Sequence, residues 1–194
     1  MEQFSIQQII FMFFFLSCTG WLLETVQESL VRHQFINKGF FRGPYVPVHG
    51  IGGIFIYFLT FSLKSYPVLV CFVGIAIGTV VEYLTSIFLE KCFKVKCWDY
   101  TTYPHTKWCH FQGRICLTIS LFFGIITLFI VYFYWDFALT VADFLGNYIW
   151  VVDGIFMTLF FTDGIFSCTS IIKAKKKNIQ IKSWAVFSDS PEVP

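Results

Sequence analysis

The chain has 194 residues, of which 56% are hydrophobic, 21% are aromatic and only 13% are charged, and its formal net charge is +2. Soluble domains average roughly 25% charged residues, so this composition excludes an ordinary soluble protein and is typical of a membrane protein. The length allows five spans of about 20 residues with short connections, and leaves no room for a separate nucleotide-binding domain. The sequence also lacks a Gly-x-x-x-x-Gly-Lys-Ser/Thr motif.

The first predicted span begins near Ser5 and continues to about Val31, with two acidic residues in its last turns. Its length and the lack of an Ala-x-Ala-like cleavage site favour a retained span over a removed signal peptide. At 100° per residue, one stripe of this helix holds Ser17, Gly20, Glu24 and Glu28. We expect this stripe to face protein or water, because a carboxylate that faces lipid is costly.

Further apolar runs predict four more spans, at residues 48–63, 68–89, 115–135 and 148–172. Pro67 suits the first turn of the third span, and Gly74-x-x-x-Gly78 predicts close helix packing within the chain. Residues 136–147 are too polar to span and are expected to form a short interfacial helix or an extended turn. The predicted fold is therefore all-α, with a five-helix transmembrane bundle over residues 1–172 and a basic, then disordered, cytoplasmic tail over residues 173–194.

Two connections carry most of the remaining sequence information. The turn Asn37–Gly50 is basic and rich in glycine and proline, so its unpaired amides need cover from protein or water at membrane depth. It is either an ordinary loop between two helices or one wall of a polar pocket at the inner membrane surface. Residues 90–113 are rich in aromatic side chains, which predicts a structured loop lying on the membrane.

The basic residues fix the expected orientation. With five spans, thirteen of the fourteen lysines and arginines fall on one side, and only Lys64 falls on the other. The positive-inside rule makes the basic side cytoplasmic. We therefore predict an N-terminus outside the cell and a C-terminus inside.

This orientation places several ionisable residues at one depth near the inner surface. We predict a substrate-binding cluster of Glu24, His49, Glu82 and Arg114. Further candidates are Glu28, Arg42, Asp99 and Asp163. Pairing of Arg114 with Glu24 or Glu82 would offset much of the desolvation cost. A purely structural ion-pair network explains the pattern equally well.

The seven cysteines are scattered and odd in number, so they do not form a secreted disulfide framework. Zinc ligands are available in Cys92, Cys97, Cys109, His105 and His110. Their spacing fits no compact Cys-x-x-Cys pattern, so we predict reduced thiols and neither a metal nor a cofactor.

Several motifs occur in order over about residues 10–135. They are Gly20-Trp21-Leu22-Leu23-Glu24, Asn37-Lys38-Gly39-Phe40-Phe41-Arg42-Gly43-Pro44, Pro47-Val48-His49-Gly50-Ile51-Gly52, Glu82-Tyr83-Leu84-Thr85-Ser86 with Glu90, Trp98-Asp99-Tyr100 and Gly113-Arg114-Ile115-Cys116. Together they resemble the family of small bacterial membrane proteins known as Putative ABC-transporter type IV. The resemblance implies a multi-pass protein of the bacterial cytoplasmic membrane with a permease-like role, a separate ATPase subunit as partner and assembly into a homo-oligomer.

Three classes of function stay open. The first is a permease-like component of a transport system; the second is an intramembrane enzyme or a lipid-headgroup-binding protein; the third is a non-catalytic membrane adaptor. The chain has no His-Glu-x-x-His or Gly-x-Ser-x-Gly motif, which disfavours an enzyme. We expect membrane lipids as partners and no nucleic acid.

Overall fold

The hydrophobic runs of the sequence form long helices in the computed structural model, which describes residues 4–93, 96, 98–101 and 106–176. In chain order the helices are α1 (Ile6–Arg32), α2 (Pro47–Thr60), α3 (Pro67–Phe93), α4 (Leu117–Phe129), α5 (Trp135–Leu145) and α6 (Ile149–Lys176). Short helical turns η1 (Phe61–Leu63), η2 (Ile130–Tyr134, a π-helix) and η3 (Gly146–Tyr148) extend or link them. The strands β1 (His110–Phe111) and β2 (Ile115–Cys116) form one antiparallel hairpin.

Local sequence signals set the helix ends. α1 begins with a capping box, in which the Gln8 amide donates to the Ser5 hydroxyl at 3.2 Å and the Ser5 amide donates to the Gln8 side chain at 3.0 Å. Pro47 opens α2 and Pro67 opens α3, where the missing N–H of proline costs nothing. The predicted position of Pro67 in the first turn is thereby confirmed.

Within the described residues, three helical stretches are long and apolar enough to cross a membrane: Ile6–Val31, Pro67–Phe93 and Leu117–Lys173. Pro47–Leu63 is a shorter apolar helix. The third stretch runs through α4, η2, α5 and α6, so the segment predicted as an interfacial helix or turn is helical. The described part of the chain is thus a mostly helical membrane protein, while the count of five spans and the sides of the two termini stay predictions.

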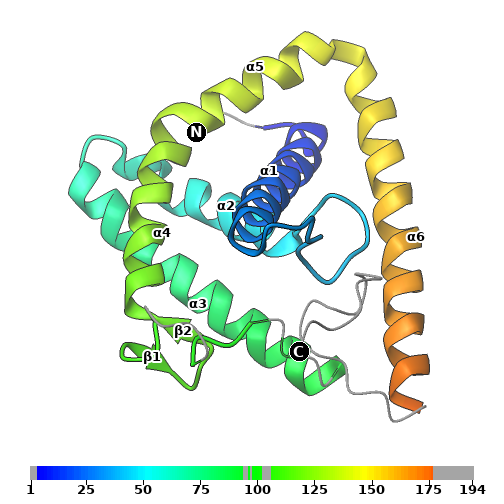
Figure 1. Cartoon of the computed structure of the whole chain (residues 1–194). Helices are drawn as coiled ribbons and strands as arrows, with labels where there is room; N and C mark the ends of the chain where they lie inside the picture. The colour runs from blue at the N-terminus through cyan, green and yellow to red at the C-terminus, as the bar shows by residue number, and fades with distance from the viewer. Residues whose placement is uncertain (1–3, 94–95, 97, 102–105, 177–194) are drawn as a thin grey trace.

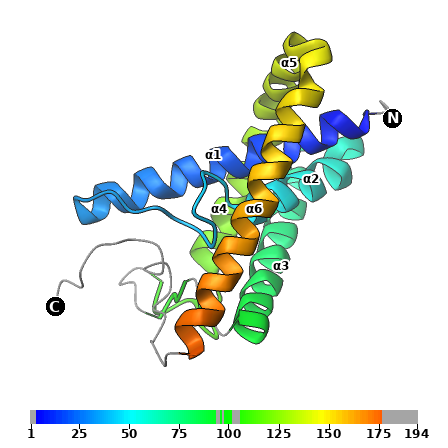
Figure 2. The ribbon, with the colours of Figure 1, turned by 90° about the vertical axis from the view of Figure 1, so that its right-hand side faces the viewer.

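The helices do not form one parallel bundle. α3 and α4 lie side by side, α5 crosses one end of the molecule, and α6 returns on the side opposite to α4 (Figure 1). α1 runs across the direction of α3 and α6 (Figure 2).

Glycines set the closest helix contacts. A Cβ atom added at Gly50 would lie 2.4 Å from the Ser17 hydroxyl oxygen, which shows how closely α2 approaches α1. A Cβ atom at Gly74 would lie 2.2 Å from the Thr127 hydroxyl oxygen, and one at Gly78 would lie 2.6 Å from the Phe123 ring. The prediction that Gly74 and Gly78 pack within the chain is confirmed, because both contact α4.

A buried aromatic cluster joins α1, α2 and α5. The Tyr57 and Trp135 rings stack with centroids 3.6 Å apart, and Phe4 packs edge-on against both. At the same end of the molecule, the Lys64 ammonium lies 3.8 Å from the Asp136 carboxylate. The sole basic residue outside the predicted cytoplasmic segments therefore lies at the junction of α4 and α5, away from the hairpin that opens α4.

Candidate functional site

The first pair of the predicted cluster joins α1 to α2. Glu24 Oε1 lies 2.7 Å from His49 Nε2, and both side chains are partly exposed, at 39% and 34%. Gly20 makes room for the imidazole, because a Cβ atom there would lie 2.2 Å from the His49 ring. The motif residues Gly20, Glu24 and His49 thus form one local arrangement, as the predicted stripe on α1 required.

The second pair joins α3 to the loop before the hairpin. The Tyr100 hydroxyl donates to Glu82 Oε1 at 2.6 Å. Glu82 is 9% exposed, and within the described residues its second oxygen is buried without a hydrogen-bond partner. A buried oxygen left in this state is costly unless a ligand, an ion, a proton or water meets it.

The carboxylates of both pairs affect the Tyr100 phenol. Its pKa is raised above the ordinary tyrosine value, first by burial, then by the Glu82 carboxylate, and further by the Glu24 carboxylate. Glu24 is therefore close enough to act on the same phenol as Glu82. The structure brings Glu24, His49 and Glu82 into one neighbourhood and adds Tyr100 to it.

Arg114 lies next to this neighbourhood but has a different partner from the one expected. Its guanidinium pairs with Glu90, and it also donates to Gln112 Oε1 at 2.6 Å. The predicted pairing of Arg114 with Glu24 or Glu82 is replaced by this contact, because the hairpin directs the Arg114 side chain along the last turns of α3. The Arg114 Nε atom is buried and has no hydrogen-bond partner among the described residues.

A cavity of about 310 Å³ opens beside this guanidinium. Its lining consists of Ile87, Glu90, Lys91, Gln112 and Arg114. Two cations and one carboxylate therefore meet in a single recess at the end of α3.

The further candidates Glu28 and Asp99 each pair with a nearby lysine. Glu28 lies 3.4 Å from the Lys38 ammonium. Asp99 accepts from Lys96 at 2.5 Å, and its pKa stays below the ordinary aspartate value because the contacts with Lys96 and Thr101 outweigh its burial. These contacts hold the ends of two loops in place.

The candidates Arg42 and Asp163 instead attach the first loop to α6. The Arg42 guanidinium donates to the Ser170 hydroxyl at 3.1 Å. Asp163 Oδ2 accepts from the Gly43 amide at 2.7 Å and from the Tyr45 hydroxyl at 2.9 Å. Arg42 and Asp163 thus fix the turn Asn37–Gly50 against the last helix.

Hydrogen bonds to α1 hold the turn Asn37–Gly50 at its start and near its end. Its start is held on α1, where Trp21 Nε1 donates to Asn37 Oδ1 at 2.6 Å, and its end is held where the Val46 amide donates to the Ser17 carbonyl at 3.0 Å. Near its end, His49 contacts Glu24. The turn therefore joins two helices and also contributes one side chain to the polar neighbourhood.

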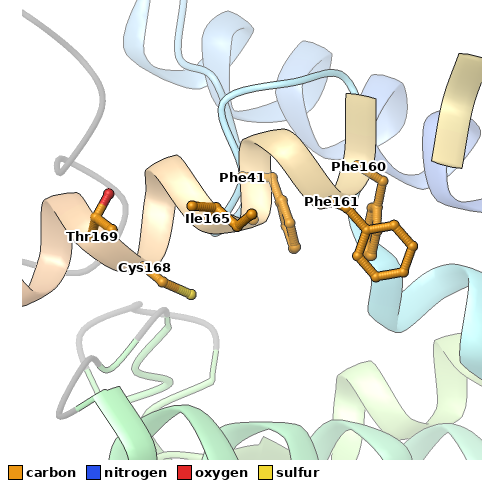
Figure 3. Close-up of a pocket in the computed structure, with 7 residues that line it drawn as sticks. Phe41, Phe160, Phe161, Ile165, Cys168 and Thr169 are labelled. Carbon is orange, nitrogen blue, oxygen red and sulfur yellow. The ribbon is translucent and has the colours of Figure 1, made fainter. Parts of the chain in front are cut away.

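A second cavity, of about 360 Å³, lies along α6 and has a different character. Phe41, Phe160, Phe161, Gly164, Ile165, Cys168 and Thr169 line it. Aromatic rings from α6 and from the first loop face this space, as Figure 3 shows. The cavity is apolar because aromatic and aliphatic side chains form most of its lining. None of the predicted site residues lines it, so it is separate from the carboxylate pairs.

Sequence reasoning missed the partners of the predicted residues. Tyr100 belongs to the Trp98-Asp99-Tyr100 motif, and its sequence suggested only an aromatic residue at the membrane interface. The sequence therefore did not indicate that Tyr100 donates to Glu82. Glu90 is 24 positions before Arg114 and meets it only because the chain reverses. The signal for that reversal is Gln112-Gly113, where both residues have positive φ, at 55° and 68°.

The predicted zinc candidates are only partly described. Cys97 and His105 lie outside the described residues. Within the residues that the structure does describe, no group of three His, Cys, Asp or Glu side chains is arranged to hold a metal ion.

Comparison with known proteins gives one match. The family model described as Putative ABC-transporter type IV matches residues 11–168, which include every predicted site residue. No curated protein and no solved structure matches the chain.

Proposed function

Since the chain belongs to the Putative ABC-transporter type IV family, we propose that it is a permease-like membrane subunit of an ABC-type transport system, with its substrate site at the Glu24 and Glu82 carboxylates. The observation that carries this proposal is the state of Glu82. One oxygen accepts from Tyr100, and the other is buried with no partner in the described residues. A substrate that donates hydrogen bonds or carries positive charge matches this unfilled acceptor.

The surroundings support a binding role over a purely structural one. A structural ion-pair network pairs each buried carboxylate with a cation or with several donors. Asp163 shows that pattern, with donors from Gly43, Tyr45 and Ser167. Glu82 has one neutral donor instead, and its second oxygen is left for a substrate that donates a hydrogen bond or carries positive charge.

Transport by this class requires energy from elsewhere, because the chain contains no nucleotide-binding motif. We propose a separate ATPase subunit that docks on the basic segments, a homo-oligomer that completes the pathway, and location in the bacterial cytoplasmic membrane. The opposite placement of Lys64 and Arg114 in the fold supports a topology of five spans with an extracellular N-terminus and a cytoplasmic C-terminus.

The central test purifies the tagged chain from cells that express it at its natural level. We expect an ATP-hydrolysing subunit to co-purify in fixed stoichiometry, and we expect Glu82→Gln to keep that complex while lowering its ATP hydrolysis at least tenfold. Asp136→Asn is the matched control, because Asp136 is an exposed carboxylate in the first turn of α5. A chain that purifies alone, without ATP hydrolysis, rules out the transport role.

Reporter fusions test the topology separately. Fusions at Leu63 and Phe144 are expected to report an extracellular position, and a fusion at Lys177 a cytoplasmic one. An extracellular signal at Lys177 would contradict the five-span arrangement.

A lipid-headgroup-binding protein is the second candidate, favoured by the cavity beside Arg114 and Lys91. Two cations in a recess suit a phosphate-bearing headgroup. Retention of anionic lipid by the wild type and its loss in Arg114→Gln, with no ATPase subunit present, would select this function.

A further inference from the structure

Two cysteines meet across the hairpin that opens α4. Cys109 precedes β1 and Cys116 ends β2. The tight turn between the strands is closed by the Arg114 amide, which donates to the Phe111 carbonyl at 3.0 Å, and the Leu117 amide donates to the Cys109 carbonyl at 3.0 Å. Residues seven positions apart are therefore held side by side by backbone contacts on both sides.

The two sulfur atoms lie 2.7 Å apart. Both thiols also lie near one acceptor, the Thr106 carbonyl, at 3.6 Å from Cys109 Sγ and 3.9 Å from Cys116 Sγ. The hairpin contacts thus direct the two sulfur atoms at each other. This pair is positioned for a bond between the sulfurs without movement of the strands.

The two thiols differ in access and in reactivity. Cys116 is 1% exposed, whereas Cys109 is partly exposed. The pKa of Cys109 is lowered, chiefly by its hydrogen bond with Cys116 and next by its contact with Thr118. A thiol that is accessible and more readily ionised is the one that attacks first, and its buried neighbour reacts second.

We propose that Cys109 and Cys116 form a redox modification site that a low-molecular-weight disulfide of the glutathione type oxidises reversibly. The Cys109 thiolate attacks one sulfur of that disulfide, which forms a mixed disulfide and releases one small thiolate. The Cys116 thiolate then attacks the Cys109 sulfur, which closes the intramolecular disulfide and releases the second small thiolate. The chain loses two electrons and two protons, and the small disulfide becomes two thiols.

The bond would lock the hairpin next to the Glu82 contact. Thr106 joins the two regions, because its hydroxyl donates to the Tyr100 carbonyl at 2.8 Å and its own carbonyl accepts from the Cys109 amide at 3.1 Å. Oxidation therefore fixes the segment that presents Tyr100 to Glu82. This inference stands on the hairpin geometry alone and does not depend on the transport role.

The test equilibrates the purified full-length chain with defined ratios of reduced and oxidised glutathione, then traps free thiols by alkylation for peptide mass spectrometry. In wild type we expect Cys109 and Cys116 to lose alkylation together and to appear as one cross-linked peptide pair. Cys116→Ala is expected to stop at a glutathione mixed disulfide on Cys109. Cys109→Ala is expected to leave Cys116 alkylatable at every ratio.

Three of the other five cysteines provide the internal control. Cys18, Cys71 and Cys168 lie in helices and are expected to be alkylated equally at all ratios after unfolding. The proposal is overturned if Cys109 and Cys116 stay alkylatable under oxidising conditions, or if Cys109 pairs with Cys92 or Cys97 instead. The wild-type titration alone decides between these results, so it does not depend on the folding of either variant.

Discussion

Two helix contacts of this protein are stabilised in different ways. Close glycine packing joins α3 to α4, whereas hydrogen bonds and aromatic contacts attach α6. α3 and α4 approach closely because glycines at 74, 78 and 124 remove side chains from the contact. On α6 the glycines do not serve packing. Among the described residues, a Cβ atom at Gly154 would meet nothing within 4 Å, and one at Gly164 would meet only Phe41, at 3.4 Å. The polar contacts of one loop with Asp163, and aromatic rings, hold α6 instead.

This difference shows two ways to join helices where lipid removes the hydrophobic driving force. Small residues allow dense van der Waals packing along a whole contact, and polar side chains give a few specific hydrogen bonds. A glycine contact is destabilised when a side-chain atom is added, and a polar contact is destabilised when its acceptor is removed. Substitutions that add an atom and substitutions that remove an acceptor therefore distinguish the two kinds of contact.

The largest effect is expected from Asp163→Ala. This change leaves the Gly43 amide without its acceptor and takes one from the Tyr45 hydroxyl, and unsatisfied buried donors cost about 1–3 kcal/mol each. We expect a loss of about 3 kcal/mol in the free energy of unfolding, measured by thermal unfolding in detergent. Ser167→Ala removes only a donor to Asp163, so a loss of about 1 kcal/mol is expected there. Equal losses in the two variants would mean that Asp163 does not anchor the loop.

Gly74→Ala is expected to have the next largest effect. The new Cβ atom would lie 2.2 Å from the Thr127 hydroxyl oxygen and 2.4 Å from Thr127 Cβ, so the helices must separate. Overpacking of this kind costs about 2 kcal/mol. Gly154→Ala is the control on α6 and is expected to raise helix stability by up to about 1 kcal/mol, because no atom of the described residues lies within 4 Å of the added methyl group. If both changes act in the same direction, the distinction between the two contacts is wrong.

Gly20→Ala applies the same idea to the polar neighbourhood. The added methyl group would overlap the His49 ring and push it away from Glu24, at a cost of about 1–2 kcal/mol in stability. Release of His49 Nε2 should raise its rate of modification by diethyl pyrocarbonate severalfold, as measured by mass spectrometry. Gly52→Ala is the matched control, since within the described part of the chain its Cβ atom would meet only Val81, at 3.8 Å. An unchanged modification rate in Gly20→Ala would show that the pair does not depend on this glycine.

These cases also show which features the sequence could predict. Apolar length predicted the long helices, and Gly74 and Gly78 predicted close packing within the chain, because both signals come from a few neighbouring residues. The sequence did not identify α4 as the partner. Glu24, His49 and Glu82 were expected together because carboxylates at one membrane depth need shared surroundings.

The partners of Arg114 and Glu82 could not be predicted in the same way. Arg114 meets Glu90, and Tyr100 meets Glu82, only after the hairpin turn fixes the course of a loop. The energies that select among such pairings are small and depend on conformation. The local sequence does not determine such partners either. The stretch Asp-Gly-Ile-Phe occurs at residues 153–156 and again at 163–166 of α6. Asp163 accepts three hydrogen bonds, whereas both Asp153 oxygens are buried without a partner in the described residues.

The smallest effect is expected from lowering the pH. Acid should weaken the polar contact at Asp99 and leave the glycine contact between α3 and α4 unchanged. The pKa of Asp99 is lowered because its contacts with Lys96 and Thr101 outweigh its burial. A lowered pKa in the fold means that the stabilisation is present above the unfolded value, near 4, and is lost as pH falls through the folded value. The Thr101 amide donates to Asp99 at 3.0 Å, so its protection from exchange should fall toward that of Asp99→Asn as pH falls below about 4.

The control is the α3–α4 contact, which contains glycines and no titrating pair. For amides of α4 around Gly124, the ratio of exchange rates between wild type and Asp99→Asn should stay constant over the same pH range. Parallel loss of protection at both places would mean that acid unfolds the whole chain and that the loop has no separate polar attachment.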